Sequence, residues 1–148
     1  MFDKEKNIAI CSDHGGYDLK EFLKKELEQQ GYLLVDYGCF SNESVDYPDI
    51  VHPLAEAVSN NKFEFGIIMC GSGNGIQMAA NKHRNVRAAL CWDIEQTKLC
   101  RMHNNANILS LAGRFIEFNL ALQMTEIFIN TPFEGGRHQL RVEKISKF

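Results

Sequence analysis

Short apolar runs alternate with amphipathic stretches along almost the whole chain. The apolar run at 7–11 predicts a buried strand, and apolar residues follow it at helical spacing from Leu19 to Leu27. Further strands are predicted at 32–37, 65–69, 86–90 and 108–111, each followed by apolar residues with helical period. The stretch at 135–148 is polar and basic and predicts one more short helix.

Two of the expected helices carry signals that locate their first turns. Pro48 and Pro53 lie near the start of the helix after the second strand, where the missing N–H of proline is tolerated. Asp93 and Gln96 have the spacing of a capping box, which predicts a helix that begins there and runs to about Asn104.

Strands that alternate with helices, without the turn signals of hairpins, predict parallel pairing through right-handed crossovers. The expected fold class is α/β, a Rossmann-like three-layer sandwich in which a five-stranded parallel sheet carries helices on both faces. With 148 residues, 45% of them apolar, the chain has the size of a single domain that spans 1–148. In such sheets ligands bind at the carboxyl ends of the strands.

Charge and cysteine content narrow the classes of function. A formal charge of -3 leaves no basic excess for wrapping nucleic acid, and no apolar stretch is long enough to span a membrane. The charged residues at 3–6 do not read as part of a signal peptide. The five cysteines are odd in number and include no Cys-x-x-Cys pair, which favours reduced thiols over disulfides or a zinc site. We therefore expect a cytoplasmic protein without a bound metal.

Polar or glycine-rich segments follow four of the predicted strands. They are 12–16, with Asp13 and His14; 46–48, with Tyr47; 70–75; and 112–114, with Arg114. Because the carboxyl ends of parallel strands meet at one edge of the sheet, these segments should converge on one cleft.

Residues 70–75, Cys-Gly-Ser-Gly-Asn-Gly, form a glycine-rich loop that opens a helix. Its unhindered N–H groups and the positive end of the helix dipole suit an anion or a developing oxyanion. Ile76 occupies the sixth position of the dinucleotide fingerprint, and the lysine of a P-loop is missing. A tight turn that needs glycine for its backbone alone would look similar.

Cys70 differs from the other cysteines in its position. It lies between a strand and the glycines, where helix N–H groups favour a reactive thiolate. Cys11 and Cys91 read instead as small core residues.

Histidines and arginines outside the glycine loop could also bind a ligand. His14 follows the first strand, and His103 and Asn104 come at the end of the fourth helix. Arg137 and Arg141 are four residues apart and share one face of a helix, where they could grip a phosphate or form a solvated basic face.

Together these segments resemble the type B ribose-5-phosphate isomerases, a family that also contains galactose-6-phosphate isomerase subunits and allose-6-phosphate isomerases. The matching segments are 12–16, 46–48, 70–75 with 79–82, 101–104, 135–138 and 141–143, in the right order between residue 8 and about residue 145. The resemblance implies that the protein interconverts ribose 5-phosphate and ribulose 5-phosphate by proton transfer through an enediolate. This is the reaction of the non-oxidative pentose phosphate pathway, and it uses neither a metal nor an organic cofactor.

The resemblance also implies a role for each candidate residue. Cys70 is the base that moves a proton between C2 and C1, and Ser72 helps move a proton between O1 and O2. Backbone N–H groups of Gly71, Gly73 and Gly75 stabilise the enediolate oxygen. His103, with Asp13 nearby, opens the furanose ring. The other residues bind substrate: Tyr47 and Asn104 hold sugar hydroxyls, and His14, Arg114, Arg137 and Arg141 grip the phosphate.

Enzymes of this family are at least dimers, and their C-terminal segment reaches the neighbouring chain. We therefore expect a homodimer or a dimer of dimers with shared active sites, in which 135–148 packs on the partner. The segment has few apolar residues of its own, so it would gain from docking in a two-fold arrangement.

Two other functions stay open at this point. A six-carbon sugar phosphate, such as allose 6-phosphate or galactose 6-phosphate, could be the substrate, because pocket depth decides the choice. A nucleotide-binding module without catalysis would use the glycine loop to hold phosphates, but it would leave Cys70, His103 and the arginine pair without a role.

Overall fold

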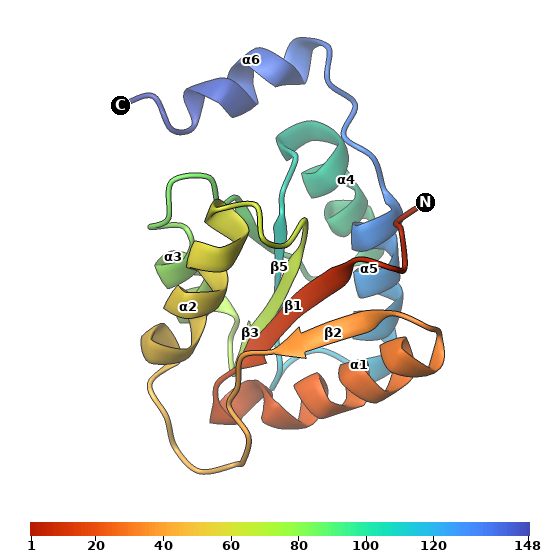
Figure 1. The fold of residues 1–148 in the computed structure, drawn as a ribbon, viewed down its shortest axis with the longest axis vertical. Helices are drawn as coiled ribbons and strands as arrows, with labels where there is room; N and C mark the ends of the chain where they lie inside the picture. Colours follow the sequence, from red (N-terminus) through yellow and green to blue (C-terminus); the bar gives the residue numbers. More distant parts are fainter.

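The structure is a computed structural model that describes residues 1–148, and its centre is a single five-stranded sheet (Figure 1). The strands are β1 (Asn7–Ser12), β2 (Leu33–Asp36), β3 (Gly66–Cys70), β4 (Ala88–Leu90) and β5 (Ile108–Ala112). The α-helices are α1 (Tyr17–Gln29), α2 (Tyr47–Ser59), α3 (Asn74–Ala80), α4 (Ile94–Asn104), α5 (Phe118–Asn130) and α6 (Arg137–Lys144). A short 3-10 turn, His14–Gly16, joins β1 to α1.

All five strands run parallel, in the order β2-β1-β3-β5-β4. The predicted α/β fold with a five-stranded parallel sheet is therefore confirmed. The chain moves outward from β1 to β2 and then crosses to the other side of β1, where it forms β3. The neighbouring ends of β1 and β3 thus mark the point where the strand order reverses, which is where sheets of this kind bind ligands.

Side chains of the strands alternate between two apolar cores, one on each face of the sheet. Ile8, Ile10, Ile67 and Met69 belong to the core that also holds the apolar faces of α1, α4 and α5. Ala9, Cys11, Ile68 and Cys70 belong to the core under α2 and α3. Figure 1 shows the same layers, with α2 and α3 on one side of the sheet and α1 and α5 on the other. The alternation places Cys70 on the face that α3 covers.

The helix starts agree only partly with the sequence signals. Asp93 caps α4 as predicted, because its Oδ1 accepts a hydrogen bond from the Gln96 N–H at 2.7 Å. The Gln96 side chain, however, reaches the N–H of Trp92 rather than that of the cap residue. Pro48 stands in the first turn of α2, but Pro53 lies inside this helix rather than near its start. Pro53 is on the exposed side, where water can reach the carbonyl oxygen that loses its partner.

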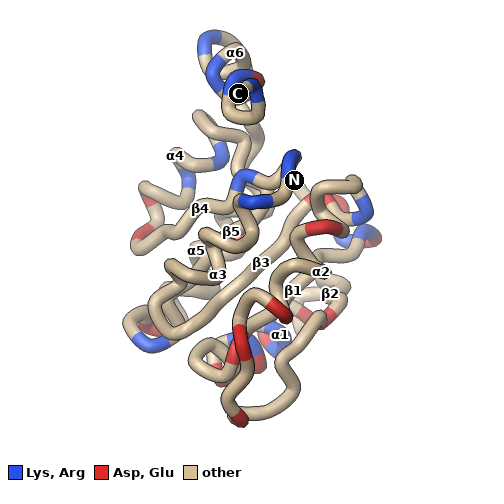
Figure 2. The backbone as a smooth tube through the Cα atoms, turned by 90° about the vertical axis from the view of Figure 1, so that its left-hand side faces the viewer, with Lys and Arg blue, Asp and Glu red and all other residues tan.

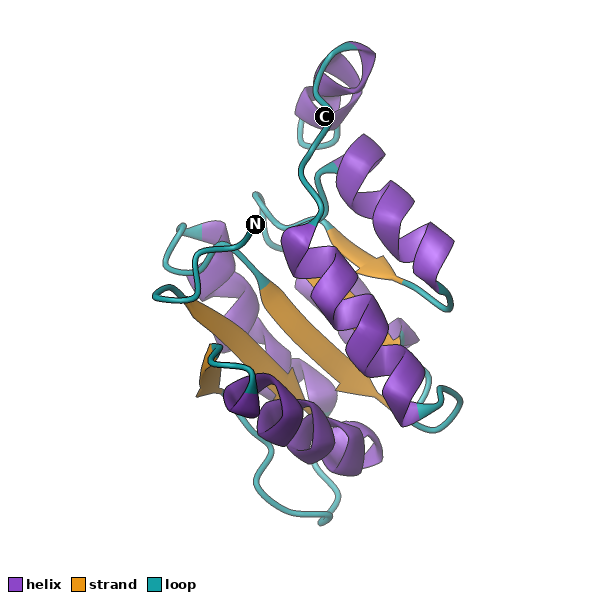
Figure 3. Ribbon diagram, turned by 90° about the vertical axis from the view of Figure 1, so that its right-hand side faces the viewer, coloured by secondary structure: helices purple, strands orange, loops and turns teal.

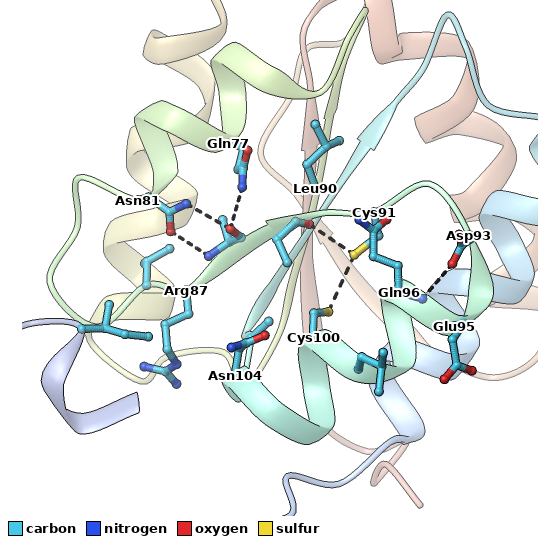
Figure 4. A pocket seen from close by; sticks show the side chains of 16 residues that line it. Gln77, Asn81, Arg87, Leu90, Cys91, Asp93, Glu95, Gln96, Cys100 and Asn104 are labelled. Carbon is cyan, nitrogen blue, oxygen red and sulfur yellow. Dashed lines mark hydrogen bonds between the residues drawn. The ribbon is translucent and has the colours of Figure 1, made fainter. Parts of the chain in front are cut away.

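The edge strand β4 is protected by two side chains of the α3 region. The Asn81 amide accepts from the N–H of Ala88 at 2.8 Å and donates to its carbonyl oxygen at 3.0 Å. The Gln77 amide donates to the same oxygen at 3.0 Å, and Figure 4 shows both side chains pointing at the strand. These amides satisfy main-chain groups that a neighbouring strand would otherwise pair.

The helices that follow the strands run back toward the amino ends of the strands. α4 and α5 therefore end near the amino ends of the strands, whereas Cys70 lies at the carboxyl end of β3. α6 lies beyond the amino ends of the strands, away from the sheet (Figures 1 and 3). Figure 2 shows basic residues gathered on α6. No helix has the length and apolar character needed to cross a membrane.

Candidate active site

Three loops meet at the carboxyl ends of β1, β3 and β5, and glycines allow their main chains to touch. A Cβ atom at Gly15 would lie 2.8 Å from the nitrogen of Gly71, and one at Gly113 would lie 2.8 Å from the carbonyl oxygen of Gly15. The N–H of Gly113 also donates to the carbonyl oxygen of Cys70 at 2.8 Å. Any side chain at Gly15 or Gly113 would push these loops apart. The loops that the sequence analysis expected to converge are therefore in contact.

Cys70 ends β3 directly beneath the glycine loop. Its Sγ accepts a hydrogen bond from the N–H of Gly73 at 3.1 Å, and the residue is only 4% exposed. Gly73 has a φ of 75°, a left-handed conformation that permits the chain to turn back over the sulfur. The sulfur thus lies at the start of α3, within hydrogen-bond distance of a main-chain N–H of the glycine loop.

A buried serine in β5 supports this loop from below. The hydroxyl of Ser110 donates to the carbonyl oxygen of Gly73 at 2.7 Å, and Ser110 is fully buried. Ser110 is not among the candidate residues that the sequence indicates. Its one sequence signal is a single polar residue within the apolar run Ile-Leu-Ser-Leu-Ala.

Asp13 and His14 occupy the loop after β1. Asp13 Oδ1 accepts hydrogen bonds from the N–H groups of Gly15 and Gly16 at 2.8 and 3.2 Å, so the carboxylate caps its own loop. His14 Nδ1 accepts from the N–H of Val45 at 3.2 Å, which leaves the hydrogen of a neutral ring on Nε2. Both residues line an open cavity of about 540 Å³ together with residues 44–49.

Tyr47 and Arg114 lie against opposite ends of the glycine-loop sequence. A Cβ at Gly75 would lie 2.5 Å from Cζ of Tyr47, and one at Gly71 would lie 3.2 Å from Cδ of Arg114. Ser72 in the same loop accepts a hydrogen bond from the N–H of Asn74 at 3.3 Å. The structure therefore gathers a first group of candidate residues at the carboxyl edge. This group, which we call the thiol group, comprises Asp13, His14, Tyr47, Cys70, Gly71, Ser72, Gly73, Gly75 and Arg114.

The remaining candidates lie at the opposite edge of the sheet. His103 and Asn104 end α4, which runs antiparallel to the strands, so they come just before the amino end of β5. Arg137 and Arg141 are on α6, beyond the same edge (Figure 1). Both arginines are exposed, and neither forms an ion pair. We call these four residues the histidine group. Within one chain the two groups do not form a common site.

His103 has two neighbours that the sequence analysis did not connect with it. Its ring stacks on that of His138, with centroids 4.3 Å apart and planes 15° apart. Nε2 of His103 lies 3.9 Å from Glu134 Oε2, and Nε2 of His138 lies 3.3 Å from the same oxygen. The three ligand atoms are close enough to hold a metal ion. Imidazole lone pairs lie in the ring planes, however, and two stacked parallel rings direct them side by side rather than at one point.

Comparison with known proteins identifies the family. The family model described as ribose/galactose isomerase matches residues 8–145. The chain belongs to this family. The resemblance that the motifs indicated is therefore confirmed.

Relatives of this isomerase family match over nearly the whole chain. Ribose-5-phosphate isomerase B of Escherichia coli is 38% identical, and a putative sugar phosphate isomerase of Bacillus subtilis is 40% identical; in both cases 95% of each chain is covered. A solved ribose 5-phosphate isomerase of Thermotoga maritima has a TM-score of 0.94 and 45% identity, covering 97% of this chain and 99% of the other. The Mycoplasma genitalium enzyme, solved with bound ribulose 5-phosphate, has a TM-score of 0.90 and 39% identity, with 95% and 94% covered.

A larger cavity of this isomerase-family chain lies away from Cys70. It has a volume of about 810 Å³ and runs beside β4, between Gln77 and Asn104 (Figure 4). Two cysteines on its wall, Cys91 and Cys100, have their sulfurs 3.7 Å apart. The hydrogen bond between the two thiols and burial raise the pKa of Cys100, while the same hydrogen bond lowers the pKa of Cys91. The residues that line this cavity do not include Cys70 or the glycines at 71–75, so the cysteine pair is not part of the glycine-loop site.

Proposed function

We propose that this protein is an aldose-ketose isomerase that interconverts ribose 5-phosphate and ribulose 5-phosphate in the cytoplasm. The observation that carries the proposal is the sulfur of Cys70, held by the Gly73 N–H inside a glycine loop at the strand-order reversal. The names of the E. coli and T. maritima relatives support the same substrate. All five cysteines are unpaired, which supports a reducing compartment.

The geometry suits proton transfer through an enediolate. Cys70 as thiolate would take the proton from C2 of the open-chain sugar and return it to C1. The N–H groups of the loop from Gly71 to Gly75 would stabilise the negative oxygen that develops meanwhile. Ser72, beside them, would shuttle a proton between O1 and O2. Because the loop is packed against its neighbours before substrate arrives, little reorganisation is needed during the reaction.

Substrate binding and ring opening would need both residue groups. From the thiol group, His14 and Arg114 would contact the phosphate, Tyr47 would hold a hydroxyl, and Asp13 would assist ring opening. From the histidine group, His103 would open the ring, Asn104 would hold a hydroxyl, and Arg137 and Arg141 would complete the phosphate site. The energy of phosphate binding would orient the sugar over Cys70.

We further propose that the protein is a homodimer in which the histidine group of one chain completes the thiol group of its partner. The separation of the two groups within one chain supports this arrangement, because one chain alone cannot bring His103 to Cys70. Exposed apolar residues of the C-terminal segment also support it: Leu140, Ile145 and Phe148 are 64%, 52% and 112% exposed. A two-fold partner would cover them and would bring two unpaired arginines to an anion.

Replacing the sulfur tests the chemistry. Cys70→Ala should abolish isomerisation of ribose 5-phosphate while substrate binding, measured by calorimetry, stays within about threefold, because the thiolate acts in proton transfer. Cys70→Ser should be nearly as inactive, since a hydroxyl is a much weaker base. Cys100→Ala is the matched control, with lower stability but normal turnover. Turnover of Cys70→Ala above about a tenth of wild type would disprove the role of the base.

Substrate range is tested in the same assay. Turnover of allose 6-phosphate is compared with that of ribose 5-phosphate, and we expect the five-carbon sugar to be preferred. A preference for the six-carbon sugar would change the substrate and leave the chemistry of Cys70 in place.

Subunit mixing tests the shared site. Cys70→Ala and Arg137→Ala, each inactive alone, are unfolded and refolded together so that chains pair at random. A mixed dimer with shared sites has one site with both defects and one site with none, so activity should return to roughly a quarter of wild type. If each site is built within one chain, every site keeps one defect and the mixture stays inactive. Native mass spectrometry verifies that mixed dimers are present.

A further inference from the structure

A carboxylate and a second imidazole surround His103 at the junction of α4 and α6. Glu134 comes from the segment between α5 and α6, and His138 is the second residue of α6. The two rings stack at 4.3 Å, and Glu134 Oε2 lies 3.3 and 3.9 Å from the Nε2 atoms of His138 and His103. His103 therefore has a flat partner against one face, and a carboxylate lies 3.9 Å from its Nε2 edge, beyond hydrogen-bond distance.

Main-chain bonds hold this arrangement in place. The N–H of Glu134 donates to the carbonyl oxygen of Met102, the residue before His103, at 3.1 Å. The N–H of His138 donates to Gly135 at 3.0 Å, and His138 is only 8% exposed. The side chain of His103 is 35% exposed, so solvent or substrate can still reach its ring. The contact thus has one buried, anchored ring and one accessible ring.

Both positive and negative groups surround the two stacked rings. Burial lowers the pKa of His138, and the nearby positive groups His103, Arg137 and Arg141 act in the same direction against Glu134. The neutral form of the His138 ring is therefore favoured. Two stacked imidazolium ions would repel each other, whereas a neutral ring beside a carboxylate leaves room for one positive charge in the cluster.

We propose that Glu134 and His138 are positioning residues for His103: the stack fixes the plane of its ring, and the carboxylate, which is closer to His138, holds the stacked ring in place and attracts the Nε2 edge of His103. The inference rests on the proposed function, in which His103 opens the sugar ring. Opening requires the imidazole to be aligned with the ring oxygen, and a misplacement of about 1 Å can cost a hundredfold in rate. Proton transfer at Cys70 does not require that alignment.

Kinetics with cyclic and open substrate test the proposal. Glu134→Ala and His138→Ala should lower kcat for ribose 5-phosphate by about tenfold to a hundredfold and change KM by less than about threefold. Glu134→Gln, which keeps the size and loses the charge, should lie between wild type and Glu134→Ala. His138→Phe, which keeps a flat ring, should recover most of the turnover. Exchange of the C1 hydrogen of ribulose 5-phosphate with deuterated water should stay within about twofold, since that substrate is already open.

Glu143→Gln is the matched control for Glu134→Gln, because Glu143 is a carboxylate on α6, the helix of His138, and pairs with Gln139 instead of the histidines. It should behave as wild type. Full activity of Glu134→Ala and His138→Ala would overturn the proposal. So would an equal loss of exchange and turnover, which indicates damage to the whole site, or a His138→Phe variant as impaired as His138→Ala.

A nuclear magnetic resonance measurement separates this inference from the proposed function. The Cε1 proton of His103 should show a ring-current shift that disappears in His138→Ala and persists in His138→Phe. If wild-type protein does not isomerise ribose 5-phosphate, the proposed function fails, but the resonance still reports whether the stack exists. If the enzyme is active and the resonance does not change in His138→Ala, the positioning role fails while the function stands.

Discussion

The close approach of Tyr47 to Gly75 predicts that Gly75→Ala destabilises the wild-type protein but stabilises a variant that lacks the Tyr47 ring. Gly75 lies in the first turn of α3, where a Cβ would be 2.5 Å from Cζ and 2.6 Å from Oη of Tyr47. Ordinary contacts are about 3.5–4.0 Å, so Gly75→Ala must displace the half-exposed tyrosine or the helix. Overpacking of this kind costs about 1–3 kcal/mol. Alanine in place of a helical glycine returns about 0.5–1 kcal/mol, so the net loss of stability should be about 1 kcal/mol.

Removing the tyrosine ring should reverse the effect. A Tyr47→Ala background removes the three atoms nearest to the new methyl group, so Gly75→Ala should stabilise the protein by about 0.5–1 kcal/mol. In a Tyr47→Phe background Cζ remains, so the substitution should still destabilise. Free energies of unfolding come from urea denaturation followed by far-ultraviolet circular dichroism, at one protein concentration because the stability of any oligomer depends on it. A change that agrees within about 0.5 kcal/mol in all three backgrounds would refute the close contact.

Two buried polar sites, the Lys20–Asp36 pair and Ser110, give further predictions. Lys20 is fully buried, and its Nζ lies 2.6 Å from Asp36 Oδ2. Asp36→Asn leaves this cation without its main partner, so it should lower the free energy of unfolding in urea by about 3 kcal/mol, more than Lys20→Met does. Equal losses of stability in the two variants would contradict this reasoning. Burial alone would raise the pKa of Asp36, but hydrogen bonds from Lys20 and Lys24 outweigh it and lower that pKa. The stabilisation from the ionised carboxylate is therefore present above about pH 4 and is lost as the pH falls through the lowered pKa. This part of acid unfolding should be absent in Asp36→Asn. Ser110→Ala removes the hydroxyl that donates a hydrogen bond to the Gly73 carbonyl oxygen, so it should lower the free energy of unfolding by about 1–3 kcal/mol and reduce kcat. The control Ser44→Ala, at an exposed serine, should change neither. An unchanged kcat in Ser110→Ala would show that the loop does not need this support.

The periodicity of apolar residues in the sequence is enough to predict the strands and helices, and with them the place of most residues of the thiol group. Apolar positions with periods of two and of about 3.6 identify strands and helices, because each element must bury one face. The carboxyl ends of parallel strands necessarily lie at one end of the sheet, so the sequence is enough to place the segments around Asp13, Tyr47, Cys70 and Arg114 together. Boundaries were less well predicted, since Pro53 proved to be inside α2.

Tertiary structure alone decided the contacts that join distant segments. Nothing local in the sequence indicates that Ser110 supports Gly73, that Tyr47 lies on Gly75, or that Glu134 and His138 enclose His103. Such contacts depend on strand order and on the angles at which helices pack, which arise from the balance of many long-range interactions. The same packing separates His103 from Cys70, because a helix that follows a strand runs back to the opposite edge of the sheet. The fold of one chain therefore keeps the two groups of candidate residues at opposite ends of the strands.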